Sequence, residues 1–201
     1  MKFKYLTQLA TKYELVLGSR SPRRVRLLRE IGIPFTQIIP DLEETREPGE
    51  EPYAFATRLA EDKAKLVGQE TNSSQVVIGS DTIVLLGDRL LGKPENADDA
   101  FEILWTLAGK KHVVCTALAL YTRGKVMASG YELTDVYFNE VKPEQVWEYI
   151  ATGEPMDKAG AYGIQAEGAF LVDRISGNLD NVIGLPRHLL EDLARGTLEQ
   201  L

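Results

Sequence analysis

Two arginines lie where a helix is expected to begin, in the segment Gly18-Ser19-Arg20-Ser21-Pro22-Arg23-Arg24. Ser21 is typical of a helix N-cap, and Pro22 is typical of the first helical position. This end of a helix is partly positive, so Arg23 and Arg24 are electrostatically unfavourable there unless an anion binds. The hydroxyls of Ser19 and Ser21, backbone N–H groups and guanidinium groups together suit a phosphate. The alternative interpretation is an exposed helix whose arginines only contact solvent.

A second candidate is Asp81, a charged residue within the otherwise apolar run 75–86. Charged groups are rarely buried without a partner or a chemical task. Asp81 could therefore be a general base, a metal ligand or both. Alternatively, it lies at a strand edge and hydrogen-bonds to Thr82 or to a turn. One cysteine and two histidines are too few for a zinc site, so any metal should be bound by oxygen, as Mg²⁺ or Mn²⁺ is.

Two lysines could add positive charge. The stretch 87–94 almost matches the phosphate-binding loop G-x-x-x-x-G-K-[ST], but Pro94 replaces the hydroxyl residue and lacks an N–H donor. The pair Gly87-Asp88 is typical of a hairpin, so we reject a true P-loop and keep Lys93 only as a point charge for phosphate. Lys63 lies on a predicted helix and, taken alone, is expected to be a solvated lysine.

The last candidate is the loop Asp157-Lys158-Ala159-Gly160-Ala161-Tyr162-Gly163-Ile164-Gln165. Its small residues would let the backbone fold closely around a planar base. Tyr162 could stack on such a base, and the amide of Gln165 could pair with its edge. A plain glycine-rich turn with a core tyrosine is the alternative.

Apolar periodicity and turn residues predict the elements that would position these groups. We expect strands at 14–17, 35–39, 75–86, 112–121, 125–139 and 169–175, and helices at 22–31, 52–69, 97–108, 143–152 and 186–195. A glycine-rich loop is expected at 153–168. This alternation predicts an α/β fold with a mixed sheet.

The composition restricts the possible classes of protein. The 201 residues suit one domain, 14–201, preceded by a frayed N-terminal extension, 1–13. A net charge of −7 disfavours extended nucleic-acid binding, although five arginines within 20–29 could bind a small anion. The lone Cys115 cannot form an intramolecular disulfide, and neither a secretory signal nor a membrane-spanning run is evident, so we expect a cytoplasmic protein without a membrane partner.

The order of these motifs carries more information than any one of them. Ser-x-Ser-Pro-Arg-Arg, Gly-Ser-Asp-Thr, Gly-Lys-Pro and Lys-Ala-Gly-Ala-Tyr-Gly-Ile-Gln follow one another over about 15–186, and this order closely resembles the Maf family. The resemblance implies an elongated mixed β-sheet flanked by helices, with two lobes around a central cleft, related to the inosine triphosphatases. It implies a nucleoside triphosphate pyrophosphatase that releases a nucleoside monophosphate and pyrophosphate. The Ala-Tyr-Gly-Ile-Gln stretch is similar to the branch acting on dTTP and UTP.

The resemblance also implies roles for individual residues. Asp81 would be the catalytic proton acceptor, with a divalent cation held by Asp81 and Glu43. The residues tied to substrate choice would be Arg23, Thr82 and Gln165. The residues that line the phosphate site would be Ser19, Ser21, Arg24, Lys63 and Lys93. A homodimer is compatible with the resemblance. The alternative function is a nucleotide-binding regulator of cell division whose hydrolysis is incidental; a buried carboxylate beside cationic lysines argues against it.

Overall fold

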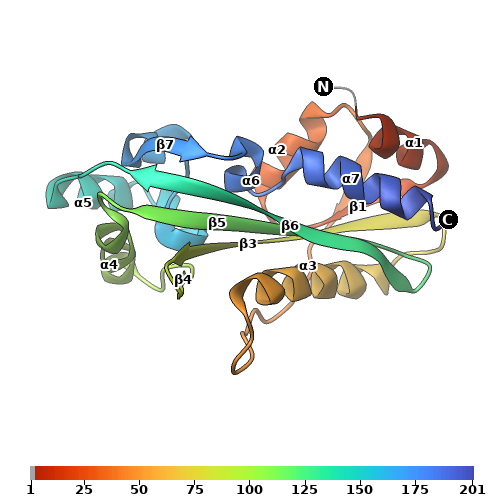
Figure 1. Cartoon of the computed structure of the whole chain (residues 1–201), viewed down its shortest axis with the longest axis horizontal. Coiled ribbons are helices and arrows are strands. Elements are labelled where there is room, and N and C mark those ends of the chain that lie inside the picture. The colour runs from red at the N-terminus through yellow and green to blue at the C-terminus, as the bar shows by residue number, and fades with distance from the viewer. Residues whose placement is uncertain (1–2) are drawn as a thin grey trace. The chain divides into compact units, whose positions relative to one another are not determined.

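The structure, a computed structural model, describes residues 3–201 (Figure 1). The helices are α1 (Lys4–Lys12), α2 (Pro22–Glu30), α3 (Pro52–Gly68), α4 (Ala97–Leu107), α5 (Pro143–Ala151), α6 (Leu179–Ile183) and α7 (Arg187–Leu198). The strands are β1 (Glu14–Gly18), β2 (Phe35–Ile38), β3 (Gln75–Leu86), β4 (Arg89–Leu91), β5 (Lys111–Thr122), β6 (Lys125–Phe138) and β7 (Val172–Ser176). Three short 3₁₀ helices are η1 (Glu154–Asp157), η2 (Ala159–Ala161) and η3 (Ala166–Leu171).

The strands of the described residues form one mixed sheet, in the order β2-β1-β3-β5-β6-β7, with β4 paired to β3. Strand β1 runs parallel to both of its neighbours, β2 and β3. In this register Val16 pairs with Thr36 of β2 and with Val77 of β3. Strands β4 and β7 pair antiparallel with β3 and β6 respectively. This sheet, flanked by helices (Figure 1), confirms the predicted α/β class and its mixed sheet.

The chain divides into two compact units that share the three longest strands. The first unit contains residues up to Asp81 together with Thr116–Glu132 and Gly184–Leu201, and the second contains Thr82–Cys115 and Leu133–Ile183. Strand β3 passes from the first unit to the second between Asp81 and Thr82. Each unit is described separately below.

Strand β1 is the central strand of the first unit, with β2 on one side and β3 on the other. Four of its five residues are buried, which is typical of a parallel strand covered on both faces. Helix α3 supplies a long apolar face, including the buried Phe55, Leu59 and Val67. This packing fixes the ends of β1 and β3, where the candidate residues of this unit lie.

The N-terminal segment corrects one expectation. Residues 4–12 form helix α1, which packs against α7 (Figure 1), and its Leu6 and Leu9 are fully buried. The carboxylate of Glu191 on α7 accepts hydrogen bonds from the N–H groups of Tyr5 (2.7 Å) and Leu6 (2.9 Å), which have no partner within the helix. The prediction of a frayed extension is therefore wrong for 4–12, because a distant glutamate caps this helix. Residues 1 and 2 of the predicted extension lie outside the described residues.

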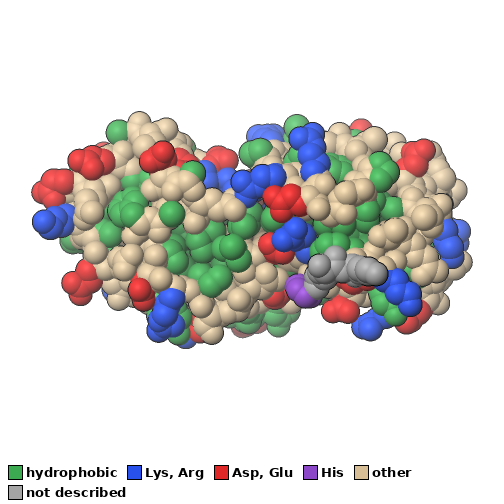
Figure 2. All heavy atoms as spheres, turned by 90° about the horizontal axis from the view of Figure 1, so that it is seen from above, with side chains coloured by type: hydrophobic (Ala, Val, Ile, Leu, Met, Phe, Trp, Pro, Cys, Tyr) green, Lys and Arg blue, Asp and Glu red, His purple; other side chains and the backbone are tan. Residues whose placement is uncertain are grey.

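The second unit packs helices α4 and α5 against its part of the sheet around one hydrophobic cluster, which includes Leu104, Val136, Phe138, Tyr149 and Tyr162. Figure 2 shows further hydrophobic side chains, in green, at the surface of this unit, on the left of the view.

Two features of the second unit differ from the expected elements. The strand predicted at 169–175 begins only at Val172, because the six residues before it form η3. Helix α6 was not expected. It is attached through the buried Asn181, whose amide donates to the carbonyl of Val114 (3.0 Å) and the hydroxyl of Thr134 (2.9 Å).

Candidate functional site

The turn between β1 and α2 has the predicted cap. Ser21 has extended backbone angles (φ −67°, ψ 118°), and its hydroxyl accepts a hydrogen bond from the N–H of Arg24, with Pro22 at the helix start. The hydroxyl of the buried Ser19 accepts from the N–H of Ser21 (3.2 Å) and from Nη1 of Arg24 (3.2 Å). A serine that accepts two hydrogen bonds still has its own proton to donate, which suits an anion at this turn.

Arg24 connects three segments of the first unit. Its Nε donates to the carbonyl of Gly184 (2.8 Å) and its Nη1 to the carbonyl of Ser80 (2.9 Å), in addition to Ser19. Burial lowers the pKa of the Arg24 guanidinium, while the negative charges of Asp81 and Glu44 act to raise it. The side chain therefore holds the helix start against β3 in this structure, and its predicted phosphate contact stays a prediction.

A charge cluster lies at the end of this part of β3, in which Lys63 and Asp81 are buried and Glu44 is exposed. Nζ of Lys63 is 2.6 Å from Oδ1 of Asp81 and 2.6 Å from Oε1 of Glu44. Lys63 is 7% exposed and Asp81 5% exposed, so this pair is almost withdrawn from water. Lys63 is thus not a solvated lysine. Removing one partner of such a pair would leave a buried charge without compensation.

Gly79 explains why Lys63 and Asp81 meet. A Cβ on Gly79 would lie 2.8 Å from Cβ of Ala64 and still closer to the carbonyl of Ala60, so β3 and α3 approach more closely than side chains would allow. Gly79 precedes Asp81 by two residues, so both lie on the same face of β3. On α3, Lys63 lies on the same face as Ala60 and Ala64. The close approach at Gly79 therefore brings the carboxylate and the ammonium into contact.

The acidic loop between β2 and α3, residues 39–51, brings Glu44 rather than the predicted Glu43 to the charge cluster. Glu43, the predicted metal ligand, is exposed, and its Oε1 accepts a hydrogen bond from the hydroxyl of Thr45 (3.1 Å). Its neighbour Glu44 is the residue that reaches Lys63. Two adjacent glutamates in a loop look alike in the sequence, and only the path of the backbone decides which one points inward. The role of Glu43 stays a prediction, and the geometry favours Glu44.

Lys93 and Gln165 lie in the second unit. The N–H of Gly160 donates to the carbonyl of Gly92 (2.9 Å), so the residue before Lys93 is bonded to the loop that leads to Gln165. Lys93 is exposed and Gln165 is half-buried. Strand β4 pairs with β3 directly after the turn at 87–88, which confirms the predicted hairpin and the rejection of a P-loop.

Tyr162 belongs to the core of the second unit. It is 6% exposed, its hydroxyl lies 2.8 Å from Nε2 of His112, and its ring meets Phe138 edge to face with centroids 4.7 Å apart. Burial raises the pKa of its hydroxyl. Of the two interpretations left open by the sequence, the structure therefore confirms the core tyrosine. Cys115 is likewise fully buried.

The structure groups the predicted residues unit by unit. In the first unit the contacts connect Ser19, Ser21, Arg24, Lys63 and Asp81, and the half-buried Arg23 lies on the first turn of α2. In the second unit Thr82 follows Asp81 directly. Sequence reasoning missed three residues that contact the first group: Glu44, Ser80 and Gly184. Ser80 and Gly184 accept hydrogen bonds through their backbone carbonyls, which no side-chain pattern in the sequence reveals.

A model of the Maf-like protein family matches residues 14–197. The chain belongs to the Maf family. Among its curated relatives is the dTTP/UTP pyrophosphatase of Aquifex aeolicus, 46% identical over 172 residues, which cover 86% of this chain and 89% of that protein. The dTTP/UTP pyrophosphatase of Pseudoalteromonas atlantica is 44% identical over 175 residues (86% and 91%), and that of Geobacter sulfurreducens is 43% identical over 186 residues (92% and 97%). The resemblance to the dTTP/UTP branch of the Maf family is thereby confirmed.

The solved structure of a nucleoside-triphosphatase / dITP/XTP pyrophosphatase from Mycobacterium abscessus shares 17% identity, with a TM-score of 0.40 over 64% of this chain and 75% of that one. The Maf match itself contains every candidate residue of both units and starts after helix α1. Among the helices described, none is long and apolar enough to cross a membrane.

Proposed function

We propose that this Maf-family chain is a nucleoside triphosphate pyrophosphatase that hydrolyses dTTP and UTP to the nucleoside monophosphate and pyrophosphate. Three relatives with this name share 43–46% identity with nearly the whole chain. The observation that carries the proposal is the Lys63 ammonium held between the carboxylates of Asp81 and Glu44. This cluster belongs to the same unit as the partly positive start of α2.

In the proposed reaction, a water oxygen bonds to the α-phosphorus, the bond from that phosphorus to the bridging oxygen breaks, and pyrophosphate leaves. Asp81 would orient the water and accept its proton. Ser19, Ser21 and Arg23 would donate to phosphate oxygens at the start of α2, while Arg24 would hold that helix start against β3. Catalysis would then consist mostly of positioning and of compensating negative charge, as is general for phosphoryl chemistry.

The residues of the first unit fit a divalent metal cofactor. The carboxylates of Asp81 and Glu44 both contact the same cationic group, the Lys63 ammonium, so they lie close to one another. Mg²⁺ is often bound by one or two carboxylates together with substrate phosphates and waters. Residues 3–201 contain no group of three or more His, Cys, Asp or Glu side chains that could hold a metal ion, so this proposal rests on the two carboxylates alone. When bound, Mg²⁺ or Mn²⁺ would offset the charge of the triphosphate. Asp81 and Glu44 would hold it.

The second unit would supply substrate choice. Gln165 would read the edge of the pyrimidine through its amide, and Lys93 would add a positive charge for phosphate. Two hydrogen bonds support a fixed conformation of the loop. One runs from the N–H of Gly160 to the carbonyl of Gly92, and the other joins the hydroxyl of Tyr162 and Nε2 of His112. Arg23 and Thr82 are the other proposed specificity positions.

A panel of nucleotides assayed with Mg²⁺ or Mn²⁺ tests the function. Steady release of pyrophosphate, fastest from dTTP and UTP, is expected. Orthophosphate as the first product would contradict the proposal, and saturable binding without any product would favour the regulator of cell division. We further propose that residues 14–201, with helix α1 packed against α7, act as one domain in the cytoplasm. The family match over 14–197 and the lone Cys115 support this proposal. We also propose that the chain forms a homodimer, which light scattering would test.

A further inference from the structure

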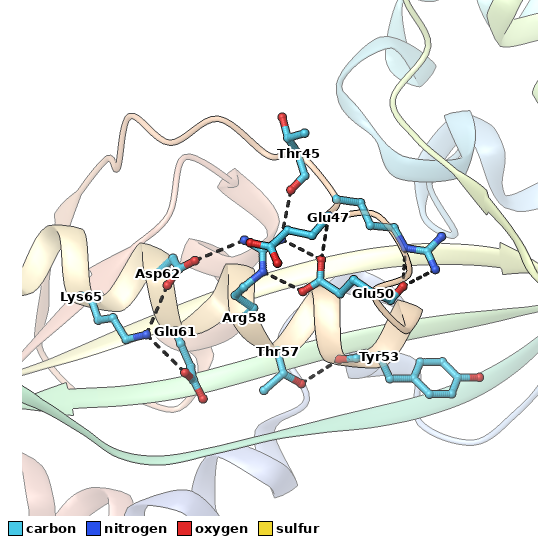
Figure 3. Close-up of polar contacts among 10 residues, drawn as sticks. Thr45, Glu47, Glu50, Tyr53, Thr57, Arg58, Glu61, Asp62 and Lys65 are labelled. Atoms are coloured by element: carbon cyan, nitrogen blue, oxygen red, sulfur yellow. Dashed lines mark hydrogen bonds and ion pairs between the residues drawn. The ribbon is translucent and has the colours of Figure 1, made fainter.

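Arg58 fastens both ends of an acidic loop to helix α3 (Figure 3). Its Nε donates to Oε1 of Glu50 (2.7 Å) and its Nη2 to Oε2 of the same carboxylate (2.8 Å), which is the bidentate geometry of strong ion pairs. The same Nη2 also donates to the carbonyl of Thr45 (3.0 Å). One guanidinium therefore holds residues 45 and 50 at once.

Glu50 organises the loop between these two points (Figure 3). Its Oε2 accepts a hydrogen bond from the N–H of Glu47 (3.1 Å), and its own N–H donates to the carbonyl of Glu47 (3.1 Å). The carbonyl of Glu50 accepts from Nε of Arg46 (2.8 Å). The hydrogen bond from Arg58 lowers the pKa of Glu50 to about 2, so this carboxylate stays ionised at neutral pH.

The fastened loop leads directly to the charge cluster. Thr45, whose carbonyl is held by Arg58, follows Glu44, and Glu44 reaches Lys63 on the same helix as Arg58. The side chain of Glu44 is 34% exposed. A partly exposed ion pair contributes little by itself, so the position of Glu44 depends on how firmly the neighbouring backbone is held.

We propose that Arg58 and Glu50 are positioning residues that hold Glu44 where it can take part in binding the divalent cation. The inference rests on the proposed function, because it gives Glu44 a task only at a metal and phosphate site. Neither Arg58 nor Glu50 touches the reacting atoms in this account. A purely structural pair would stabilise the protein without affecting the affinity for a cation.

The test uses Arg58→Ala, with Lys65→Ala as the matched control. Lys65 lies on the same helix, and its ion pairs, with Glu61 (3.4 Å) and Asp62 (3.2 Å), are to residues of that helix (Figure 3). The probe is Mn²⁺ alone, counted as free ion by electron paramagnetic resonance in the absence of nucleotide. Hydrogen–deuterium exchange of the N–H groups of Glu47 and Glu50 reports on the loop directly.

Loss of the charge-assisted hydrogen bonds of Arg58 should weaken Mn²⁺ binding about tenfold and speed exchange at Glu47 and Glu50 by at least as much. Lys65→Ala should leave both values unchanged. In a Glu44→Gln background, Arg58→Ala should weaken Mn²⁺ binding no further, because both changes remove the same contribution. If Arg58→Ala does not fold, Arg58→Lys keeps the charge without the fork and should weaken binding to a smaller degree.

Unchanged Mn²⁺ affinity in the Arg58 variants, Mn²⁺ affinity that does not depend on Glu44, or an equal further loss in the Glu44→Gln background would each overturn the inference. Failure of the proposed function is a separate result. It would appear as wild-type protein that binds Mn²⁺ through Glu44 but releases no pyrophosphate from any nucleotide.

Discussion

Replacing Gly79 with alanine should push α3 away from β3 and separate Lys63 from Asp81. The new Cβ would lie 2.8 Å from Cβ of Ala64 and closer still to the carbonyl of Ala60. Non-bonded carbon atoms keep about 3.5–4.0 Å apart, so the helix must move by roughly 1 Å. The Lys63–Asp81 distance of 2.6 Å would then become too long for a hydrogen bond. Overpacking of this kind costs about 1–3 kcal/mol of unfolding free energy.

Urea unfolding and pyrophosphate release would measure the two effects of Gly79→Ala. We expect the midpoint to fall with an unchanged m-value, and kcat to fall even at temperatures where the variant is fully folded. Gly196→Ala is the matched control, because Gly196 lies within α7 and its new Cβ would meet nothing within 4 Å apart from its chain neighbours and the backbone of its own helix. It should stabilise the protein by about 0.5–1 kcal/mol through helix propensity. A Gly79→Ala variant with wild-type stability and rate would refute the packing argument.

Three further predictions concern the second unit. Gln165→Ala should reduce the preference for dTTP and UTP over purine triphosphates in kcat/KM; an unchanged ranking would remove Gln165 from base reading. Burial lowers the pKa of His112 from 6.5 to about 4. As the pH falls, the imidazole is therefore protonated in the unfolded chain before it is protonated in the folded chain, which favours unfolding. The contribution of neutral His112 to the unfolding free energy should be fully present above pH 6.5 and should fall by about 3 kcal/mol as the pH drops to 4. Urea titrations across this range should show that slope in wild type and not in His112→Phe. Tyr162→Phe should cost about 1–3 kcal/mol by leaving a buried His112 nitrogen unpaired, and an unchanged midpoint would contradict that hydrogen bond.

Features that depend on neighbouring residues in the chain could be predicted from the sequence. The cap at Ser21 and the hairpin after β3 each follow from one or two residues with strong local preferences. The apolar runs likewise predict the strands β1 and β3 within a residue or two. For these elements the local preference and the final fold agree.

Features that depend on distant residues could not be predicted. Lys63 looked like a solvated lysine, because nothing in its helix reveals that Gly79 lets β3 come close enough for Asp81 to reach it. Helix α1 depends on Glu191 far along the chain. The loop motif leaves open whether Tyr162 stacks on a base or belongs to the core, because it does not show that His112 lies behind the ring.

Pyrophosphate release from dTTP and UTP by the wild type and by Asp81→Asn, with Mg²⁺, tests the central claim most directly. The wild type should turn over steadily, and the variant should lose at least about 10²–10⁴-fold in kcat, the range for removing a general base. Cooperative urea unfolding of the variant would show that the loss is chemical. An Asp81→Asn variant with a near-normal rate would contradict the claim that Asp81 carries the reaction.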